Sequence, residues 1–194
     1  MNQPLNIKII VGSTRQNRFG DKPAQWIADL ASKREGITAE ILDLRNYEMP
    51  FFNEPVSPSM ITEPYANPAV KAWTAKIAEG DAFIMVTPEY NHATSAVLKN
   101  AIDYVNREWN RKAIAFVGYG TVGGARSVEQ LRTVAAELQT VSIRTAVHIP
   151  MPWLLLDENG GLKPGALDPF VQNAEMMLDQ LVWWASALKT ARVQ

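Results

Sequence analysis

The chain has 194 residues, of which 47% are hydrophobic and 20% charged, with 19 basic and 20 acidic side chains. This length and composition predict a single globular domain over residues 1–194 with a substantial buried core. The nearly balanced charge offers no global field for nucleic acid, and the absence of cysteine excludes disulfides, thiolate metal sites and cysteine nucleophiles.

Apolar runs and helical patterns alternate along the whole chain. The apolar runs predict strands over residues 6–11, 39–43, 82–87, 113–117 and 142–148. The helical patterns predict helices over residues 21–34, 68–79, 95–107, 125–138 and 168–189. Asn67 is expected to cap the second helix, and Ser95 or Thr94 the third.

Several predicted strands are almost wholly apolar, as expected when helices cover both faces of a sheet. Five strands that alternate with five helices predict an α/β fold with a three-layer, doubly wound parallel sheet. The flavodoxin-like order 2-1-3-4-5 fits this count, whereas the chain is too short for a six-stranded dinucleotide fold with a substrate domain.

Two long connections interrupt the alternation. Residues 45–65 contain four prolines and are expected to form a loop. Residues 150–165 are rich in proline and glycine, with residues 154–156 as a candidate short strand. Such connections often frame a ligand or an oligomer contact.

The first strand is followed by a loop, residues 12–20, that is rich in hydroxyls and guanidinium groups. Ser13 and Thr14 supply hydroxyl donors, and Arg15 and Arg18 can form charge-assisted hydrogen bonds. The amino end of the next helix adds positive potential, so the segment suits a phosphate. The alternative is a solvated loop with two surface arginines.

The loop after the third strand reads Thr-Pro-Glu-Tyr-Asn-His-Ala over residues 87–93. Its tyrosine, amide and imidazole can lie against a planar heteroaromatic ring, although an ordinary polar loop remains the alternative. Glu89 has no carboxylate or histidine partner at a telling spacing, so acid–base catalysis is not expected.

The loop after the fourth strand, residues 118–123, matches G-x-G-x-x-G. A dinucleotide site would need an acidic residue about 20 positions on, at the tip of the next strand, but Glu137 falls in a predicted helix. The pattern therefore indicates a loop whose backbone approaches a ligand edge closely. The alternative is a tight turn that needs positive φ angles.

Together these segments resemble the NADPH-dependent FMN reductase family, a flavodoxin-like group that includes quinone, azo-dye and chromate reductases. The resemblance rests on G-S-x-R, T-P-E-Y-N, the downstream L-K-N-A-I-D-Y and the glycine loop, and covers roughly residues 5–150. It implies an FMN phosphate held by Ser13, Arg15 and the backbone near Arg18, Phe19 and Gly20. It places the isoalloxazine and ribityl chain against Pro88, Glu89, Tyr90 and Asn91. It places the pyrimidine end beside Gly118, Tyr119 and Gly120.

The resemblance also implies an activity. A nicotinamide donor, NADPH or NADH, would reduce bound FMN, and a quinone, flavin or similar small molecule would then take the electrons in a ping-pong cycle. Family members form dimers or pairs of dimers, so a homodimer or homotetramer is expected, with Trp109 either at the subunit boundary or in the core. The rival functions are a one-electron flavodoxin-type carrier or flavin-linked regulatory protein, and a non-redox phosphate binder.

Further expectations concern location and the two histidines. No signal peptide and no apolar run of roughly 18 residues is visible, so we expect a cytoplasmic protein without a membrane partner. His92 and His148 are too few for a multi-histidine metal centre, and no metal is expected. A catalytic role for His92 stays open.

Overall fold

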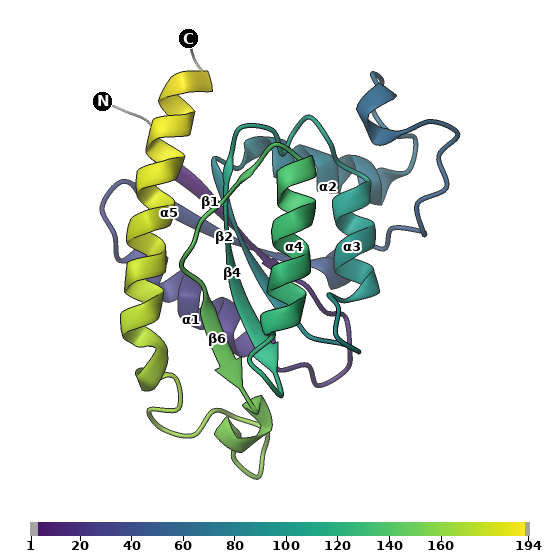
Figure 1. The fold of residues 1–194 in the computed structure, drawn as a ribbon. Coiled ribbons are helices and arrows are strands. Elements are labelled where there is room, and N and C mark those ends of the chain that lie inside the picture. The colour runs from purple at the N-terminus through teal and green to yellow at the C-terminus, as the bar shows by residue number, and fades with distance from the viewer. Residues whose placement is uncertain (1–3, 193–194) are drawn as a thin grey trace.

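The computed structural model describes residues 4–192, and the fold is built on one parallel sheet (Figure 1). Within that range the strands are β1 (Leu5–Val11), β2 (Ile37–Asp43), β3 (Ala82–Pro88), β4 (Ala113–Gly120), β5 (Val141–Ser142) and β6 (Val147–Pro150). Their order is β2-β1-β3-β4-β5, and β6 also pairs with β4. The predicted flavodoxin-like order 2-1-3-4-5 is confirmed.

The fifth strand is not continuous as predicted, because residues 144–146 leave the ladder between β5 and β6, although the N–H of Ile143 still donates to the carbonyl of Ile114 in β4 (3.0 Å). Arg132 donates to the carbonyls of Ile143 and Arg144, which therefore do not pair with β4. The backbone N–H of Thr145 donates to the side chain of Gln180. Side chains from two helices thus replace the strand pairing.

Two helices cover one face of the sheet and three cover the other (Figure 1). The first face carries α1 (Asp21–Ser32) and α5 (Val171–Arg192), and the second carries α2 (Pro68–Glu79), α3 (Ala96–Asp103) and α4 (Ala125–Glu137). The buried strand residues divide between the two resulting apolar cores. This double covering explains the wholly apolar strands.

Two predicted helix caps are confirmed, and one helix is shorter than expected. Asn67 accepts from the N–H groups of the first turn of α2, and Ser95 accepts from the N–H of Leu98 in α3. Helix α3 ends at Asp103 rather than at residue 107 because Tyr104 turns into the core. Trp109 is fully buried against Phe83, with ring centroids 4.6 Å apart, so it is a core residue of this chain.

The two long connections lack regular strands. Residues 45–65 form a loop with short 3₁₀ turns at its start and at Pro58–Met60. The strand predicted at residues 154–156 is wrong, because Pro152–Leu155 forms a 3₁₀ helix. Proline at its first position sets a helical φ angle, and Leu156 makes only an isolated bridge to Leu162. No helix within residues 4–192 is long and apolar enough to cross a membrane.

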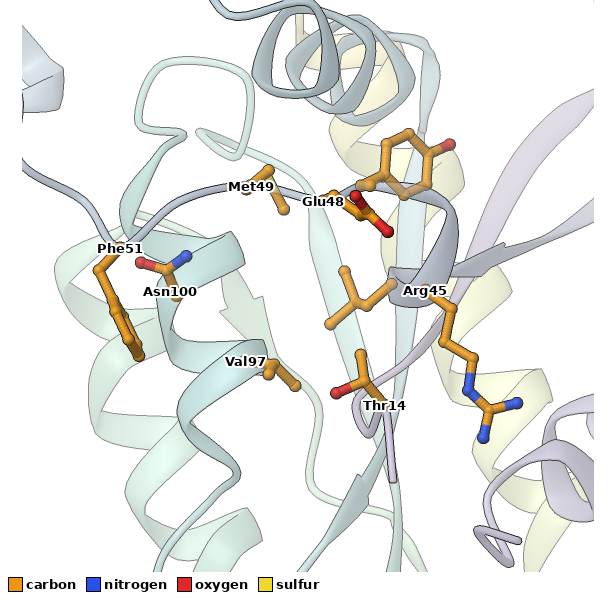
Figure 2. A pocket seen from close by; sticks show the side chains of 9 residues that line it. Thr14, Arg45, Glu48, Met49, Phe51, Val97 and Asn100 are labelled. Carbon is orange, nitrogen blue, oxygen red and sulfur yellow. The ribbon is translucent and has the colours of Figure 1, made fainter. Parts of the chain in front are cut away.

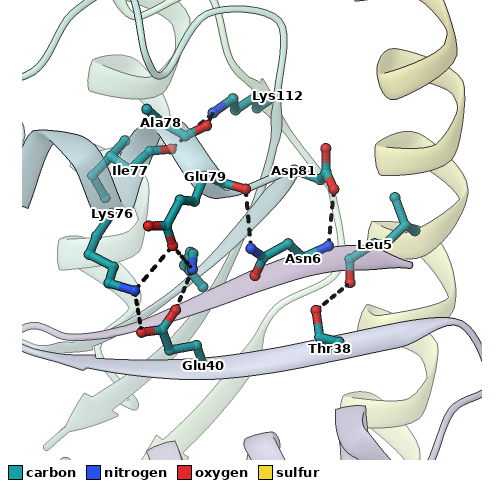
Figure 3. A network of polar contacts seen from close by, with 11 residues as sticks. Leu5, Asn6, Thr38, Glu40, Lys76, Ile77, Ala78, Glu79, Asp81 and Lys112 are labelled. Atoms are coloured by element: carbon teal, nitrogen blue, oxygen red, sulfur yellow. Dashed lines mark hydrogen bonds and ion pairs between the residues drawn. The ribbon is translucent and has the colours of Figure 1, made fainter. Parts of the chain in front are cut away.

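Two lysines, Lys8 within β1 and Lys112 just before β4, are buried. Figure 3 shows Lys112 beside the end of α2. Lys8 forms ion pairs with Glu40 and Glu79. Lys112 donates to the carbonyls of Ile77 (2.9 Å) and Ala78 (3.0 Å) at the end of α2. These contacts tie the helix to the sheet at the edge opposite the loops.

Replacing Lys112 with methionine should remove a pH-dependent contribution to stability. Burial, with a smaller effect of the nearby Arg192 charge, lowers the pKa of Lys112 to about 8, whereas the pKa of a lysine in the unfolded chain is about 10.4. Between these values the unfolded chain binds more protons, so stability rises with pH. We expect the unfolding free energy of the wild type, relative to K112M, to rise by about 2 kcal/mol from about pH 7 to about pH 9.5. Urea denaturation at several pH values measures this difference, and a constant difference would contradict the assignment.

Candidate functional site

The three predicted loops converge at the carboxyl ends of β1, β3 and β4 around a cavity of about 260 Å³. In a parallel sheet of this order, β1 and β3 flank the point where the strand order reverses, which is where ligands bind. Eight of the predicted site residues line this cavity, namely Arg15, Arg18, Phe19, Pro88, Glu89, Tyr90, Tyr119 and Gly120. Ser13, Gly20, Asn91 and Gly118 do not line it.

The β1–α1 loop exposes a row of backbone amides. Within the part of the chain that the structure describes, the N–H groups of residues 16–21 have no hydrogen-bond acceptor. The row ends at the amino terminus of α1, where the helix dipole favours negative charge. Backbone donors in such a row suit an anion, so the predicted phosphate site remains a prediction for this loop.

Arg18 is not available to an anion in the way its position suggested. Its guanidinium is buried, donates to the carbonyl of Ser13 and pairs with Asp21 and Asp43. Burial alone lowers the pKa of Arg18, but the hydrogen bonds and charges of Asp43 and Asp21 outweigh it and raise that pKa. The Arg18 guanidinium is therefore already engaged by protein groups, although Arg18 is one of the residues that line the cavity.

Arg15 is the exposed arginine of the same loop, and it lines the cavity. Among residues 4–192 its guanidinium has no hydrogen-bond or ion-pair partner, so its charge is available to a ligand. Ser13 is buried beside it, with its hydroxyl 2.8 Å from the hydroxyl of Tyr90. This contact links the first loop to the second.

Tyr119 carries a buried hydroxyl without a protein partner. Its ring packs against Phe19, with centroids 5.4 Å apart. A Cβ atom on Gly20 would lie 2.8 Å from the Tyr119 oxygen, so glycine leaves room for that hydroxyl at the start of α1. Burial raises the pKa of the hydroxyl, so it stays protonated. Among the described residues it has no well-aligned hydrogen-bond partner, but its oxygen is enclosed by protein atoms and is not open to a ligand in the cavity.

Glu89 is held in an ion pair with Arg126. Its carboxylate, 7% exposed, accepts from Arg126 Nε (2.8 Å) and from the Arg126 backbone N–H (3.1 Å). It therefore caps the first turn of α4 from the neighbouring loop. Asn91 and His92 are exposed and both have positive φ angles, which turn the chain back toward α3.

The glycines at the end of β4 and in the turn that follows are required by local packing and backbone conformation. A Cβ atom on Gly118 would lie 2.7 Å from the carbonyl oxygen of Gly123, and one on Gly124 would lie 2.6 Å from the backbone nitrogen of Tyr119. Gly120, Gly123 and Gly124 also have positive φ angles. The tight-turn alternative therefore accounts for three of the four glycines by their φ angles, and close packing accounts for Gly118. Tyr119 and Gly120 lie at the cavity wall.

The sequence interpretation missed the outer wall of the cavity. Pro152, Trp153 and Leu156 line it from the 3₁₀ segment after β6, and the N–H of Met151 donates to the carbonyl of Gly120 (2.8 Å). Trp153 is half exposed, as are Met151 and Leu154. This cluster of apolar side chains directly after a strand was the available signal.

A second cavity, of about 400 Å³, lies on the other side of the β1–α1 loop. Figure 2 shows Thr14 and Arg45 at one end and Phe51 at the other. The loop thus separates two cavities. Within residues 4–192 no cluster of three histidine, aspartate or glutamate side chains could hold a metal ion.

The fold and these loops define a flavodoxin-like α/β protein in which a loop with unpaired backbone amides in the described residues lies beside a partly aromatic cavity. The family model described as NADPH-dependent FMN reductase matches residues 5–153. An NAD(P)H-dependent FMN reductase from Schizosaccharomyces pombe is 35% identical over 166 residues, which cover 86% of this chain and 80% of that protein. The chain belongs to the NADPH-dependent FMN reductase family.

A second relative and one solved structure are also similar to this chain. A 2-hydroxy-1,4-benzoquinone reductase from a Burkholderia species is 29% identical over 167 residues, covering 81% of this chain and 85% of that protein. The solved structure of FerB, a flavoenzyme NAD(P)H:(acceptor) oxidoreductase from Paracoccus denitrificans, has the same fold. Its TM-score is 0.71 at 22% identity, over 91% of this chain and 97% of that chain. The predicted class, an oxidoreductase that uses FMN and NAD(P)H, is confirmed.

Proposed function

We propose that the protein transfers reducing equivalents from NADPH or NADH through bound FMN to a quinone, a free flavin or a similar small acceptor. The observation that carries the proposal is the cavity itself. Unpaired amides and Arg15 lie at one end, and Pro88, Tyr119 and Trp153 line the remainder. A phosphate on one end of a planar ring system matches this division of polar and apolar surface.

Each loop has a separate task in this proposal. Ser13, Arg15 and the backbone from Arg18 to Gly20 hold the phosphate. Pro88, Glu89, Tyr90 and Asn91 lie along the ribityl chain and ring, and Gly118, Tyr119 and Gly120 lie at the pyrimidine end. When bound, FMN supplies the two-electron chemistry, so this chain needs no nucleophile of its own. The outer wall around Trp153 limits access of water to the ring.

We also propose that donor and acceptor use the same cavity in turn, which is a ping-pong cycle. Initial rates at several fixed NADPH concentrations, with a benzoquinone as the varied acceptor, test this order. Parallel double-reciprocal lines are expected, because the donor product leaves before the acceptor binds. Intersecting lines would show that both bind together and would overturn the ping-pong cycle.

A homodimer or homotetramer belongs to the same proposal. Phe51 is 79% exposed and Met60 67% exposed, both on the long connection between β2 and α2. Large apolar side chains gathered on one exposed loop support a contact between subunits. Sedimentation equilibrium tests this, and a monomer at micromolar concentration would contradict it. The cytoplasmic location stays a prediction.

A further inference from the structure

We propose that Asp43, Arg18 and Arg45 form a clamp that orients the β1–α1 loop for phosphate binding, with Asp43 as a positioning residue outside the loop. Asp43 is the last residue of β2, and sequence analysis assigned it no role. The inference rests on the proposed FMN site, because it concerns how that site is shaped.

The first half of the clamp is the pair between Arg18 and Asp43. Arg18 Nη1 donates to Asp43 Oδ1 (2.8 Å) and Nη2 donates to Asp43 Oδ2 (2.5 Å), which is the bidentate arrangement of the strongest arginine–carboxylate pairs. The same guanidinium donates to the carbonyl of Ser13. The loop is thus fastened to the end of the neighbouring strand.

The second half comes from Arg45, two residues beyond Asp43. The Arg45 backbone N–H donates to Asp43 Oδ1 (2.9 Å), which fixes the turn after β2. The Arg45 guanidinium donates to the carbonyl of Arg15. Burial alone raises the pKa of Asp43, but bonds from Arg18 and the Arg45 N–H outweigh it and lower that pKa, so the carboxylate stays charged.

These bonds determine which way two peptide groups of the loop point. No described peptide bond is cis, and in a trans peptide the C=O and the following N–H point in opposite directions. Because the carbonyls of Ser13 and Arg15 point at guanidinium groups, the amides of Thr14 and Gln16 point away from them. Two oxygens that would repel a phosphate are therefore engaged elsewhere.

The clamp acts through geometry, because its own charges cancel. Arg18 pairs with Asp21 and Asp43, and Arg45 lies 3.8 Å from Asp21, so two cations face two anions. Arg15 is the remaining cation of this loop. Removing the Asp43 charge should therefore lower FMN affinity if Arg18 is part of the clamp, and should not lower it if Arg18 is a phosphate ligand.

The test compares FMN with riboflavin, which lacks the phosphate, by titrating apoprotein of D43N, R45K and the control D179N. Asp179 also pairs with an arginine, Arg34, but lies on α5. We expect D43N to weaken FMN binding about tenfold with riboflavin binding unchanged, since a charge-assisted bond that orients the loop is lost. In R45K the side chain keeps its charge but loses the planar guanidinium, so the ratio of FMN affinity to riboflavin affinity should fall as in D43N. D179N should change neither affinity.

Unchanged or tighter FMN binding would overturn the clamp. If Arg18 were a direct phosphate ligand, removing its carboxylate competitor would leave FMN binding to D43N unchanged or tighter, and the clamp would be overturned. If D43N does not fold, R45K decides alone, and an unchanged ratio of FMN to riboflavin affinity overturns the clamp. A wild-type protein that binds neither flavin would contradict the proposed function and the clamp together. A failure of the clamp alone would appear only in the variants, so the wild-type titration separates the two cases.

Discussion

Gly124→Ala should destabilise the protein by about 3 kcal/mol or more, the largest effect expected of any single methyl group here. The added Cβ atom would lie 2.6 Å from the backbone nitrogen of Tyr119 and 2.8 Å from the Cα of Gly118. Both contacts are with backbone, which cannot rotate away as a side chain would. The φ angle of +70° adds the strain of a left-handed conformation.

Gly160→Ala is the matched control for this substitution. Gly160 has a φ angle of +76°, but a Cβ atom there would meet nothing within 4 Å. It should cost only the conformational strain, about 1 kcal/mol. Guanidinium denaturation of both variants separates the clash from the strain. Equal losses would show that the glycine loop does not pack as closely as the structure indicates.

Arg15→Gln should weaken FMN binding about a hundredfold and leave riboflavin binding unchanged. Arg15 lines the cavity, and its charge is not neutralised by a partner within the described residues. A charge-assisted, bidentate bond to phosphate is worth about 2–3 kcal/mol, which corresponds to this change in affinity. Fluorescence titration of the apoprotein with each flavin measures both constants.

Arg144→Gln is the control for Arg15, because it also removes one exposed arginine but lies outside the cavity. It should leave both flavin affinities within about twofold of the wild type, since a distant exposed charge is screened by salt. A loss of FMN affinity of similar size in both variants would indicate a general charge effect. Arg15 would then not be the specific phosphate ligand.

The central strands and the starts of two helices were predictable because the information for them is local, and the sheet order followed from the count of alternating strands and helices. Each central strand is a run of apolar residues between polar turns, and both confirmed caps, Asn67 and Ser95, lie immediately before their helices. The division of the fifth strand was not predictable in the same way. It depends on Arg132 in α4, which donates hydrogen bonds to the carbonyls of Ile143 and Arg144 further along the chain.

The site shows the same division between local and distant contacts. The convergence of the three loops follows from parallel topology, so their meeting could be predicted before any side chain was placed. The ion pair of Arg18 could not be predicted in this way, because its partner Asp43 is 25 residues away and is brought close only by the pairing of β1 with β2. The glycines were interpreted as ligand contacts because their packing against one another depends on the turn they form.

The most direct test of the account is the visible spectrum of the protein reconstituted with FMN, followed by anaerobic addition of NADPH. We predict a bound flavin spectrum that bleaches within the time of one turnover, without an accumulated one-electron species, and recovers when a benzoquinone is added. A protein that binds no FMN would contradict the site. Bound FMN that NADPH or NADH leaves oxidised would contradict the reductase and favour the flavodoxin-type carrier or a flavin-linked regulatory role.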